Sequence, residues 1–171
     1  MINIDYDAAG KLLWEICKER KCNKPEDLNV DEWGEITMHH SDKNFWLAYK
    51  YKVRWDRMIS LGFYNYIDIF TEEEIDYVFD CLVQQLNIFD FAEFIDKANV
   101  SIEWIESHID YLEEPSFKVL AERQLPLQFI WKYYDRFPME SKHKMLKNQK
   151  CLKPYHDKIY EAIKSIIREN V

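Results

Sequence analysis

The chain of 171 residues has few of the residues that form tight turns, with three glycines and five prolines. β-Sandwiches and barrels join many strands through glycine-rich turns, and glycine-rich phosphate-binding loops need several glycines in one short segment. The sequence therefore argues against a many-stranded β fold and against both kinds of phosphate-binding loop. Its composition also excludes collagen-like chains and flexible linkers.

Long apolar runs and cysteine motifs are also missing. No segment approaches the roughly 18 consecutive apolar residues of a membrane-spanning helix. The first residues, Met1 to Asp5, have neither the basic end nor the apolar run of a signal peptide. The four cysteines form no CxxC pair, so a disulfide framework is not expected. We therefore expect a soluble, cytoplasmic protein without membrane contact.

The sequence contains no recognisable catalytic or metal-binding motif. His39 and His40 are adjacent and point about 100° apart on a helix, so they do not form the i,i+4 pair that clamps a metal ion. HExxH and GxSxG motifs are absent. Cys81 lies beside an apolar stripe, which suits a core residue rather than a nucleophile. We predict no catalytic residue, no metal site and no cofactor, and hence a protein that is not an enzyme.

Apolar residues make up 47% of the chain, enough for a core, and their spacing is mainly helical. The clearest helix is predicted over 71–86, where Thr71 and Glu74 form a capping box before an apolar stripe. Pro154 suits the first turn of a C-terminal helix. Further helices are predicted over 7–21, 88–98, 102–112, 126–136 and 154–169.

One segment has the pattern of a strand. Aromatic and apolar side chains alternate along 45–55, and 41–44 suits the turn of a small β-hairpin over 35–53. The repeat pattern around this segment favours a helix at 45–51 instead. The hairpin is kept as the structural alternative.

A degenerate repeat begins at Trp33, at Phe117, at Lys142 and at Leu82. Its copies share positions 3, 4, 7, 12 and 13 residues after the start. The copy from Leu82 keeps only the last two of these, Phe94 and Ile95, and has Trp104 at 22 residues after the start, where the first copy has Trp55. In the first copy these positions are Ile36, Thr37, His40, Phe45 and Trp46. In the second they are Leu120, Ala121, Gln124, Phe129 and Ile130. In the third they are Met145, Leu146, Gln149, Pro154 and Tyr155.

This pattern resembles the short helix-turn-helix repeats found in tandem in phage and large-virus proteins. The resemblance spans about 33–155 with large gaps, and its matching pieces are Trp33 to Thr37, Lys52 to Asp56, and Arg123-Gln124 with Phe129-Ile130. It implies pairs of short helices that bury their apolar faces by stacking on neighbouring pairs. Helices 7–21 and 154–169 would then cap the ends, and Trp33, Trp55, Trp104 and Trp131 would lie at least partly inside.

We therefore predict an all-α protein of about nine short helices. They form an irregular helical-repeat solenoid or a compact bundle within one domain, 1–171.

Charge is distributed unevenly along the chain. Residues 60–114 contain 14 acidic residues and one basic residue, whereas 115–171 contain 12 basic and six acidic residues. Glu72, Asp76 and Asp80 recur every four residues, which places their carboxylates about 6 Å apart along one helical ridge. The predicted acidic face consists of Glu72, Glu73, Asp76, Asp80, Asp90, Glu93, Asp96, Glu103, Glu106 and Asp110.

An acidic face repels nucleic acids and attracts the basic grooves that bind them. With the viral resemblance, this indicates a phage or viral inhibitor in the host cytoplasm. The inhibitor would bind a basic, nucleic-acid-handling host protein in the manner of a nucleic-acid mimic. A solvated face that only maintains solubility is the simpler interpretation.

The lysine-rich segment 142–158 supports an alternative function. Lysines interleaved with aromatic residues can follow a phosphate backbone, which would make the protein a nucleic-acid-binding accessory protein. The candidate residues are Lys144, Lys147, Lys150 and Lys153. Contact between this positive end and the acidic middle, within the molecule or between copies of a homo-oligomer, is a further alternative.

Overall fold

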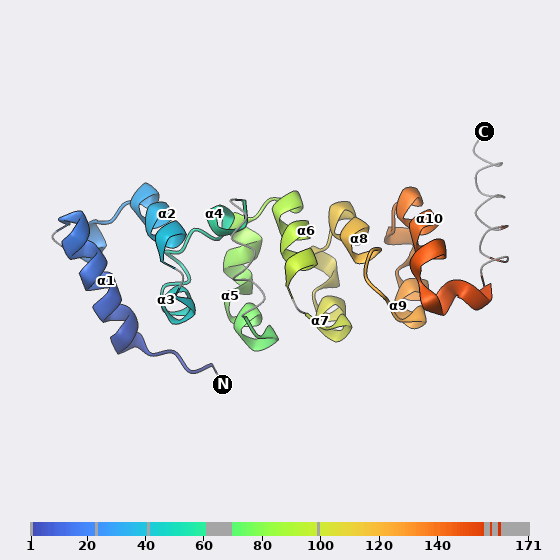
Figure 1. The fold of residues 1–171 in the computed structure, drawn as a ribbon, viewed down its shortest axis with the longest axis horizontal. Helices are drawn as coiled ribbons and strands as arrows, with labels where there is room; N and C mark the ends of the chain where they lie inside the picture. Colours follow the sequence, from blue (N-terminus) through green and yellow to red (C-terminus); the bar gives the residue numbers. More distant parts are fainter. Residues whose placement is uncertain are drawn as a thin grey trace. The chain divides into compact units, whose positions relative to one another are not determined.

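The computed structural model describes residues 2–22, 24–40, 42–60, 70–98, 100–155, 158 and 161. The regular elements in these ranges are helices, and no strand occurs in them (Figure 1). The prediction of an all-α fold is confirmed. The chain divides into two compact units, residues 1–100 (unit 1) and 101–171 (unit 2). The single domain, the number of helices and their stacking as a solenoid stay predictions.

The described residues of unit 1 form several α-helices, and three of them begin and end close to the predicted positions. The helices are α1 (Tyr6–Arg20), α2 (Val30–His39), α3 (Lys43–Ala48), α4 (Trp55–Ser60), α5 (Glu72–Gln85) and α6 (Ile88–Lys97), with a 3-10 turn, η1, at Pro25–Asp27. The bounds of α1, α5 and α6 lie within one residue of the predicted 7–21, 71–86 and 88–98. Local signals in the sequence were therefore sufficient for these three helices.

Helices of unit 1 begin with polar side chains that bind the free amide groups of the first turn. Thr71 Oγ1 accepts a hydrogen bond from the Glu74 N–H (3.3 Å), and Glu74 Oε2 accepts one from the Thr71 N–H (2.8 Å). This is the predicted capping box. The N-cap residues are Asp5 for α1, Asn29 for α2, Asp42 for α3, Thr71 for α5 and Asn87 for α6.

The alternative of a β-hairpin over 35–53 is wrong. This segment contains the end of α2 and all of α3, because Asp42 accepts the Phe45 N–H (2.6 Å) and starts a helix. The consecutive residues Phe45, Trp46 and Leu47 are all buried. A strand would turn Trp46 to the opposite face from its two neighbours, so the alternation along 45–55 is coincidental.

The core of unit 1 is formed around α4, which packs against α2, α5 and α6, while α1 packs against α3. The ring of Trp33 lies 6.2 Å from the ring of Phe45 between centroids. The loop before α4 is held by Gln85 at the end of α5. Its Oε1 accepts the Trp55 N–H (2.9 Å), and its Nε2 donates to the Val53 carbonyl (3.1 Å).

Helix α1 ends in an unusual backbone conformation. Lys21 has φ 57°, in the left-handed region that glycine normally occupies. The Cys22 N–H donates to the Cys17 carbonyl (3.0 Å), which closes the last turn of α1. A chain with three glycines thus uses a lysine at this helix end.

Unit 2 consists of shorter helices, several of them followed by a 3-10 turn. They are α7 (Ile102–Ser107), η3 (Ile109–Tyr111), α8 (Glu114–Leu120), α9 (Leu127–Lys132), η4 (Tyr134–Arg136), α10 (Met139–Asn148) and η5 (Lys150–Tyr155). The predicted helices 102–112 and 126–136 are each an α-helix plus a 3-10 turn. Pro154 was expected to start a helix but lies inside η5. The remainder of the predicted helix 154–169 lies almost entirely outside the described residues.

A buried glutamine holds the loop between α8 and α9. Gln149, the residue after α10, is completely buried. Its Oε1 accepts the Leu125 N–H (2.8 Å), and its Nε2 donates to the carbonyls of Ala121 and Arg123. One side chain therefore satisfies three backbone groups that the loop would otherwise leave unpaired.

Most positions of the proposed repeat lie in the core. The buried ones include Trp33, Ile36, Phe45, Trp46, Leu82, Phe94, Ile95, Phe117, Leu120, Phe129, Ile130, Met145 and Leu146. Pro154 and Tyr155 in the third copy are exposed. Trp131, which we expected at least partly inside, is 48% exposed, because Phe129 and Ile130 occupy the buried side of α9. The relation to viral repeats stays a prediction.

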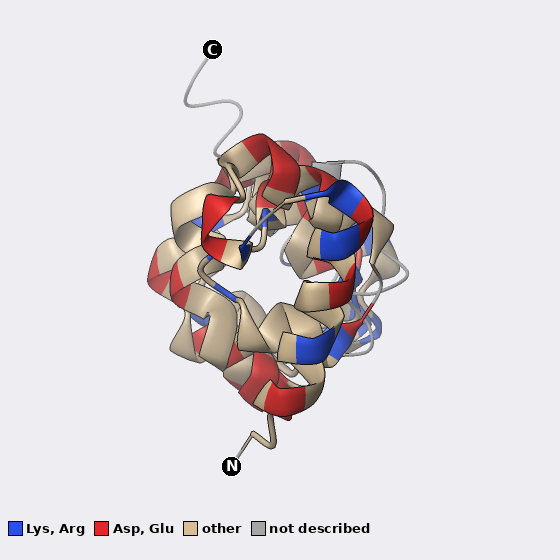
Figure 2. Ribbon diagram, turned by 90° about the vertical axis from the view of Figure 1, so that its left-hand side faces the viewer, with Lys and Arg blue, Asp and Glu red and all other residues tan. Residues whose placement is uncertain are grey.

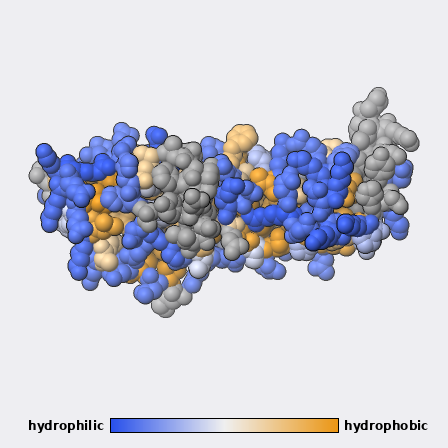
Figure 3. Space-filling view, in the orientation of Figure 1, coloured by the Kyte–Doolittle hydropathy of each residue, from blue (hydrophilic) through white to orange (hydrophobic). Residues whose placement is uncertain are grey.

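None of the described helices combines the length and the apolar character needed to cross a lipid bilayer. The face of the molecule in Figure 3 is mostly hydrophilic, and hydrophobic residues appear on it in small, separate areas.

Candidate partner-binding surface

Helix α5 carries the ridge of carboxylates predicted from the sequence. Ile75, Val78, Phe79 and Leu82 are buried on one side of this helix. Glu73, Asp76 and Asp80 are exposed on the other side, with Glu72 half-buried beside them. Successive turns rise by about 5.4 Å, so Glu72, Asp76 and Asp80 form a continuous row on the outer side of α5.

Helix α6 adds a second group of carboxylates in the same unit. Phe91, Ala92, Phe94 and Ile95 are buried. Asp96 is exposed, while Asp90 and Glu93 are half-buried.

The two helices are anchored to one core. The rings of Phe79 on α5 and Phe91 on α6 meet edge to face at 6.1 Å between centroids. Phe94 of α6 lines a small apolar cavity together with Trp55 and Met58 of α4. Because both helices rest on the same packed side chains, their outer sides present the carboxylates from fixed positions.

Glu74 on α5 connects this helix to α3. Lys43 on α3 binds its carboxylate at 2.9 Å. Burial alone would raise the pKa of Glu74, but the hydrogen bonds from Thr71 and Lys43 outweigh it and hold the pKa below its ordinary value. Glu74 is therefore a structural group whose negative charge is already balanced by Lys43.

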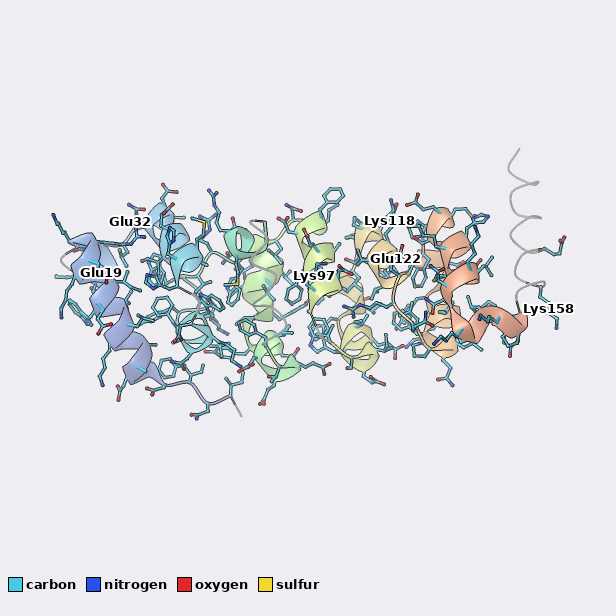
Figure 4. All side chains as sticks on the ribbon, viewed as in Figure 1. Glu19, Glu32, Lys97, Lys118, Glu122 and Lys158 are labelled. Atoms are coloured by element: carbon cyan, nitrogen blue, oxygen red, sulfur yellow. The ribbon has the colours of Figure 1, made fainter. Side chains whose placement is uncertain are left out.

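Some charge on α6 is also balanced locally. Lys97 lies 3.0 Å from Asp96, and the Asn87 side-chain amide donates to Asp90 at 2.6 Å. Figure 4 shows Lys97 on α6. Residues 71–98 nevertheless contain eight acidic residues and this single lysine.

The three remaining predicted carboxylates belong to unit 2. Glu103 and Asp110 are exposed, whereas Glu106 is paired with Lys132 at 2.9 Å. The hydrogen bond from Lys132 lowers the pKa of Glu106. The candidate acidic surface is therefore defined by the seven residues of unit 1: Glu72, Glu73, Asp76, Asp80, Asp90, Glu93 and Asp96.

Exposed apolar side chains surround the turn between α5 and α6. Val83 is 37% exposed, Ile88 49% and Phe89 69%. Phe89 follows the N-cap Asn87 and lies one residue before Asp90. Sequence reasoning missed these residues, although each of them departs from the apolar stripe of its helix. They give the acidic surface an apolar component.

The lysine-rich segment of unit 2 is only partly available for a ligand. Lys144 forms an ion pair with Glu122 (2.9 Å), and the Lys142 ammonium lies 4.6 Å from the centre of the Tyr134 ring. Lys147, Lys150 and Lys153 are exposed.

Two other basic residues of unit 2 are also engaged by groups of the same unit. Lys118 on α8 lies 3.4 Å from Glu114 and 3.2 Å from Glu140, and Figure 4 labels it on this helix. Arg136 donates to the carbonyls of Ile109 and Leu112. Its guanidinium is thus engaged in holding unit 2 together.

The two units differ strongly in net charge. Residues 1–100 contain 20 acidic and 11 basic residues, whereas residues 101–171 contain 11 acidic and 12 basic residues. The two signs can be followed in red and blue in Figure 2. Within the described ranges, no group of three or more His, Cys, Asp or Glu side chains is placed to hold a metal ion.

Comparison with models of known protein families gave no match, and the searches of characterised proteins and of solved structures also returned none.

Proposed function

We propose that the acidic surface of α5 and α6 binds a protein partner with a basic surface. The observation that supports this is the row of outward carboxylates on α5, with further carboxylates on α6, which shares its core, in a stretch with a single lysine. Such a surface attracts Lys- and Arg-rich grooves over long distances and repels nucleic acids. The natural partner class is a nucleic-acid-handling protein of a host cell, which the chain would block by occupying its phosphate-binding groove.

The exposed side chains at the α5–α6 turn suit the same function. Protein interfaces combine charged rims with a few aromatic or aliphatic anchors that become buried on binding. Phe89 provides such an anchor beside Asp90 and Glu93. A face that served only solubility would gain nothing from an exposed phenylalanine.

The test uses protamine, an arginine-rich DNA-binding protein, as the basic probe. Binding of labelled protamine to the native chain is measured by fluorescence anisotropy at low and high salt. The triple variant Glu72→Lys, Asp76→Lys and Asp80→Lys should weaken binding at least tenfold. The affinity of the native chain should fall steeply as salt screens the charges.

A control variant separates the surface from the net charge. Asp7→Lys, Glu15→Lys and Glu19→Lys change the same number of exposed carboxylates on α1. This variant should keep most of the affinity. Equal losses in the two triple variants would contradict the proposal, because binding would then depend on total charge alone.

Nucleic-acid binding by unit 2 is the second candidate. It is favoured by the exposed side chains of Lys147, Lys150 and Lys153 and by the half-exposed Trp131, whose ring lies 6.1 Å from that of Tyr134. Such aromatic rings can stack on bases. Gel retardation of single-stranded DNA at low salt that is abolished by Lys147→Glu, Lys150→Glu and Lys153→Glu would support this function. No retardation by the native chain would exclude it.

A further inference from the structure

Two cysteines lie close together where α1 ends. Cys17 is in the last turn of α1, and Cys22 follows this helix by two residues. Both are free thiols. The Cys22 N–H donates to the Cys17 carbonyl (3.0 Å), and the Cys22 thiol donates to the same carbonyl oxygen (3.4 Å). Two groups of Cys22 are therefore directed at Cys17.

The backbone brings this pair within reach of a disulfide bond. The hydrogen bond of 3.0 Å between the Cys22 nitrogen and the Cys17 oxygen, with standard bond lengths, limits the separation of the two Cα atoms to about 7 Å. A disulfide cannot bridge Cα atoms that are farther apart than this. The left-handed conformation of Lys21, with φ 57°, turns the chain back, so that Cys22 meets the last turn of the helix.

The two thiols differ in their access to solvent. Cys17 is 1% exposed, whereas Cys22 is half-buried. Burial raises the pKa of Cys17 to about 12, and a side-chain hydrogen bond with Cys22 adds to the rise. An oxidant in solution therefore meets Cys22 first, and the thiol of Cys17 lies beside it to complete the reaction.

Basic side chains accompany the accessible thiol. Segment 18–24 contains four basic residues and one acidic residue. The basic ones are all exposed: Lys18, Arg20, Lys21 and Lys24. Such a cluster attracts an anionic oxidant. Glutathione disulfide, a small peptide disulfide with a net negative charge, is an oxidant of this kind.

We propose that Cys17 and Cys22 are a redox pair that glutathione disulfide converts to a disulfide bond. The Cys22 thiol releases its proton to water, and its sulfur bonds to one sulfur of glutathione disulfide while one glutathione leaves as a thiolate. The Cys17 thiol then releases its proton, its sulfur bonds to Cys22 Sγ, and the second glutathione leaves. The two cysteines are oxidised, and glutathione disulfide is reduced to two thiols.

The bond would tie the end of α1 to the segment that leads into η1. Excess reduced glutathione reverses both steps, so the state of the pair follows the ratio of the two forms of glutathione. This inference is independent of the proposed function.

The test treats the full chain with glutathione disulfide, blocks the remaining thiols with iodoacetamide in denaturant, and digests the product with trypsin. Trypsin cuts between the two cysteines, after Lys18, Arg20 and Lys21. The cysteines therefore leave in separate peptides, 12–18 and 22–43, unless a disulfide joins them. Mass spectrometry should find the joined peptides at least about tenfold above any other pair of cysteine peptides, because the second step occurs within one molecule.

Cys151 is the matched internal control. Like Cys22 it is half-buried, and its thiol donates to a backbone carbonyl, that of Leu125 (3.3 Å). It is the one cysteine in the sequence of unit 2. It should carry glutathione or iodoacetamide and should not appear in a joined pair.

Two variants separate the steps. In Cys17→Ala the second thiol is missing, so glutathione should stay on Cys22, whereas the native chain should keep less than about a tenth as much. In Cys22→Ser the buried Cys17 should remain free of glutathione. Thermal melting verifies that each variant is folded.

The native chain alone decides the proposal, even if a variant fails to fold. Glutathione that stays on Cys22 without the joined peptides 12–18 and 22–43 would overturn it. A Cys22 that does not react would overturn it as well, and so would joined peptides of Cys81 or Cys151 in equal amount.

Discussion

In each unit of the chain a glutamine side chain holds a loop in place, but the two glutamines differ in how deeply they are buried. In unit 1, Gln85 binds the N–H and the carbonyl of residues two positions apart, in 53–55. In unit 2, Gln149 binds the equivalent pair in 123–125 and reaches one carbonyl more. Gln85 is half-buried, whereas Gln149 is fully buried. The two loops are thus held by a similar pattern of hydrogen bonds, but the loop of unit 2 depends more on its glutamine than the loop of unit 1 does.

The units also start their helices differently. Unit 1 uses side-chain caps such as Asn29, Thr71 and Asn87. In unit 2, Ser101 caps α7, but in the described part of the chain the residues before α8, α9 and α10 make no side-chain capping bond. These residues are Glu113, Pro126 and Pro138. The stability of unit 1 is therefore spread over many small contributions, and that of unit 2 depends more on its buried glutamine.

The largest effect is expected for Gln149→Ala. Removing this side chain leaves three backbone groups without partners, and each costs on the order of 1–3 kcal/mol, so we expect a loss of about 3–5 kcal/mol in the free energy of unfolding. Urea denaturation followed by circular dichroism measures it. The exposed Gln128→Ala is the matched control and should change stability by less than about 0.5 kcal/mol.

Gln85→Ala should cost less, about 1–2 kcal/mol, because two groups lose a partner and water can reach the half-buried position. Its exposed neighbour Gln84→Ala provides the control. The same denaturation experiment applies. A loss as large as that for Gln149→Ala would remove the distinction between the two glutamines.

Replacing the residue before a helix should lower the stability of the chain when the helix is in unit 1, and should have little effect when it is in unit 2. Thr71→Ala removes the acceptor for the Glu74 N–H and should cost about 1 kcal/mol, while Thr71→Ser should restore it. Glu113→Ala, at the start of α8, should stay within about 0.5 kcal/mol of the native chain. Similar losses of stability for the two alanine variants would show that the residues before α5 and α8 contribute equally to stability, contrary to the difference described between the units.

The smallest effect concerns pH. The pKa of Glu74 is lowered in the folded chain, so its contribution is present above the ordinary pKa of a glutamate and is lost as the pH falls through the lowered value. Glu74→Gln should reduce stability by about 1 kcal/mol at pH 7 and by little at pH 3. Glu106→Gln in unit 2 should have no measurable effect at either pH, since its ion pair with Lys132 is screened by solvent. Denaturation at the two pH values compares them.

Local signals explain what was predictable in the fold. Thr71, Glu74 and the apolar stripe lie within one helix, and the bounds of α5 followed from them. The alternation along 45–55 misled because the burial of Phe45, Trp46 and Leu47 depends on contacts with other helices. The position of Trp131 also depends on contacts with other helices, because Phe129 and Ile130 are the residues of α9 that are buried in the core.

The candidate surface was predictable to the same extent. The carboxylate row on α5 follows from four-residue spacing. The contact of Lys50 with the ring of Tyr77 does not, because the turn after α3 and α5 come together only in the folded chain. Gln149 was singled out as a repeat position, but its hydrogen bonds to a loop more than twenty residues away require the folded chain.

The end of α1 is a place where the stability of the chain could be raised, because Lys21 has a left-handed backbone conformation. Lys21 carries a Cβ atom in a backbone conformation that penalises one, by about 1 kcal/mol relative to glycine. Its amide bonds to the last turn would be kept by any residue with an N–H. Position 21 is thus a natural first site for engineering a more stable form of this protein. It lies far in the sequence from the carboxylates of α5.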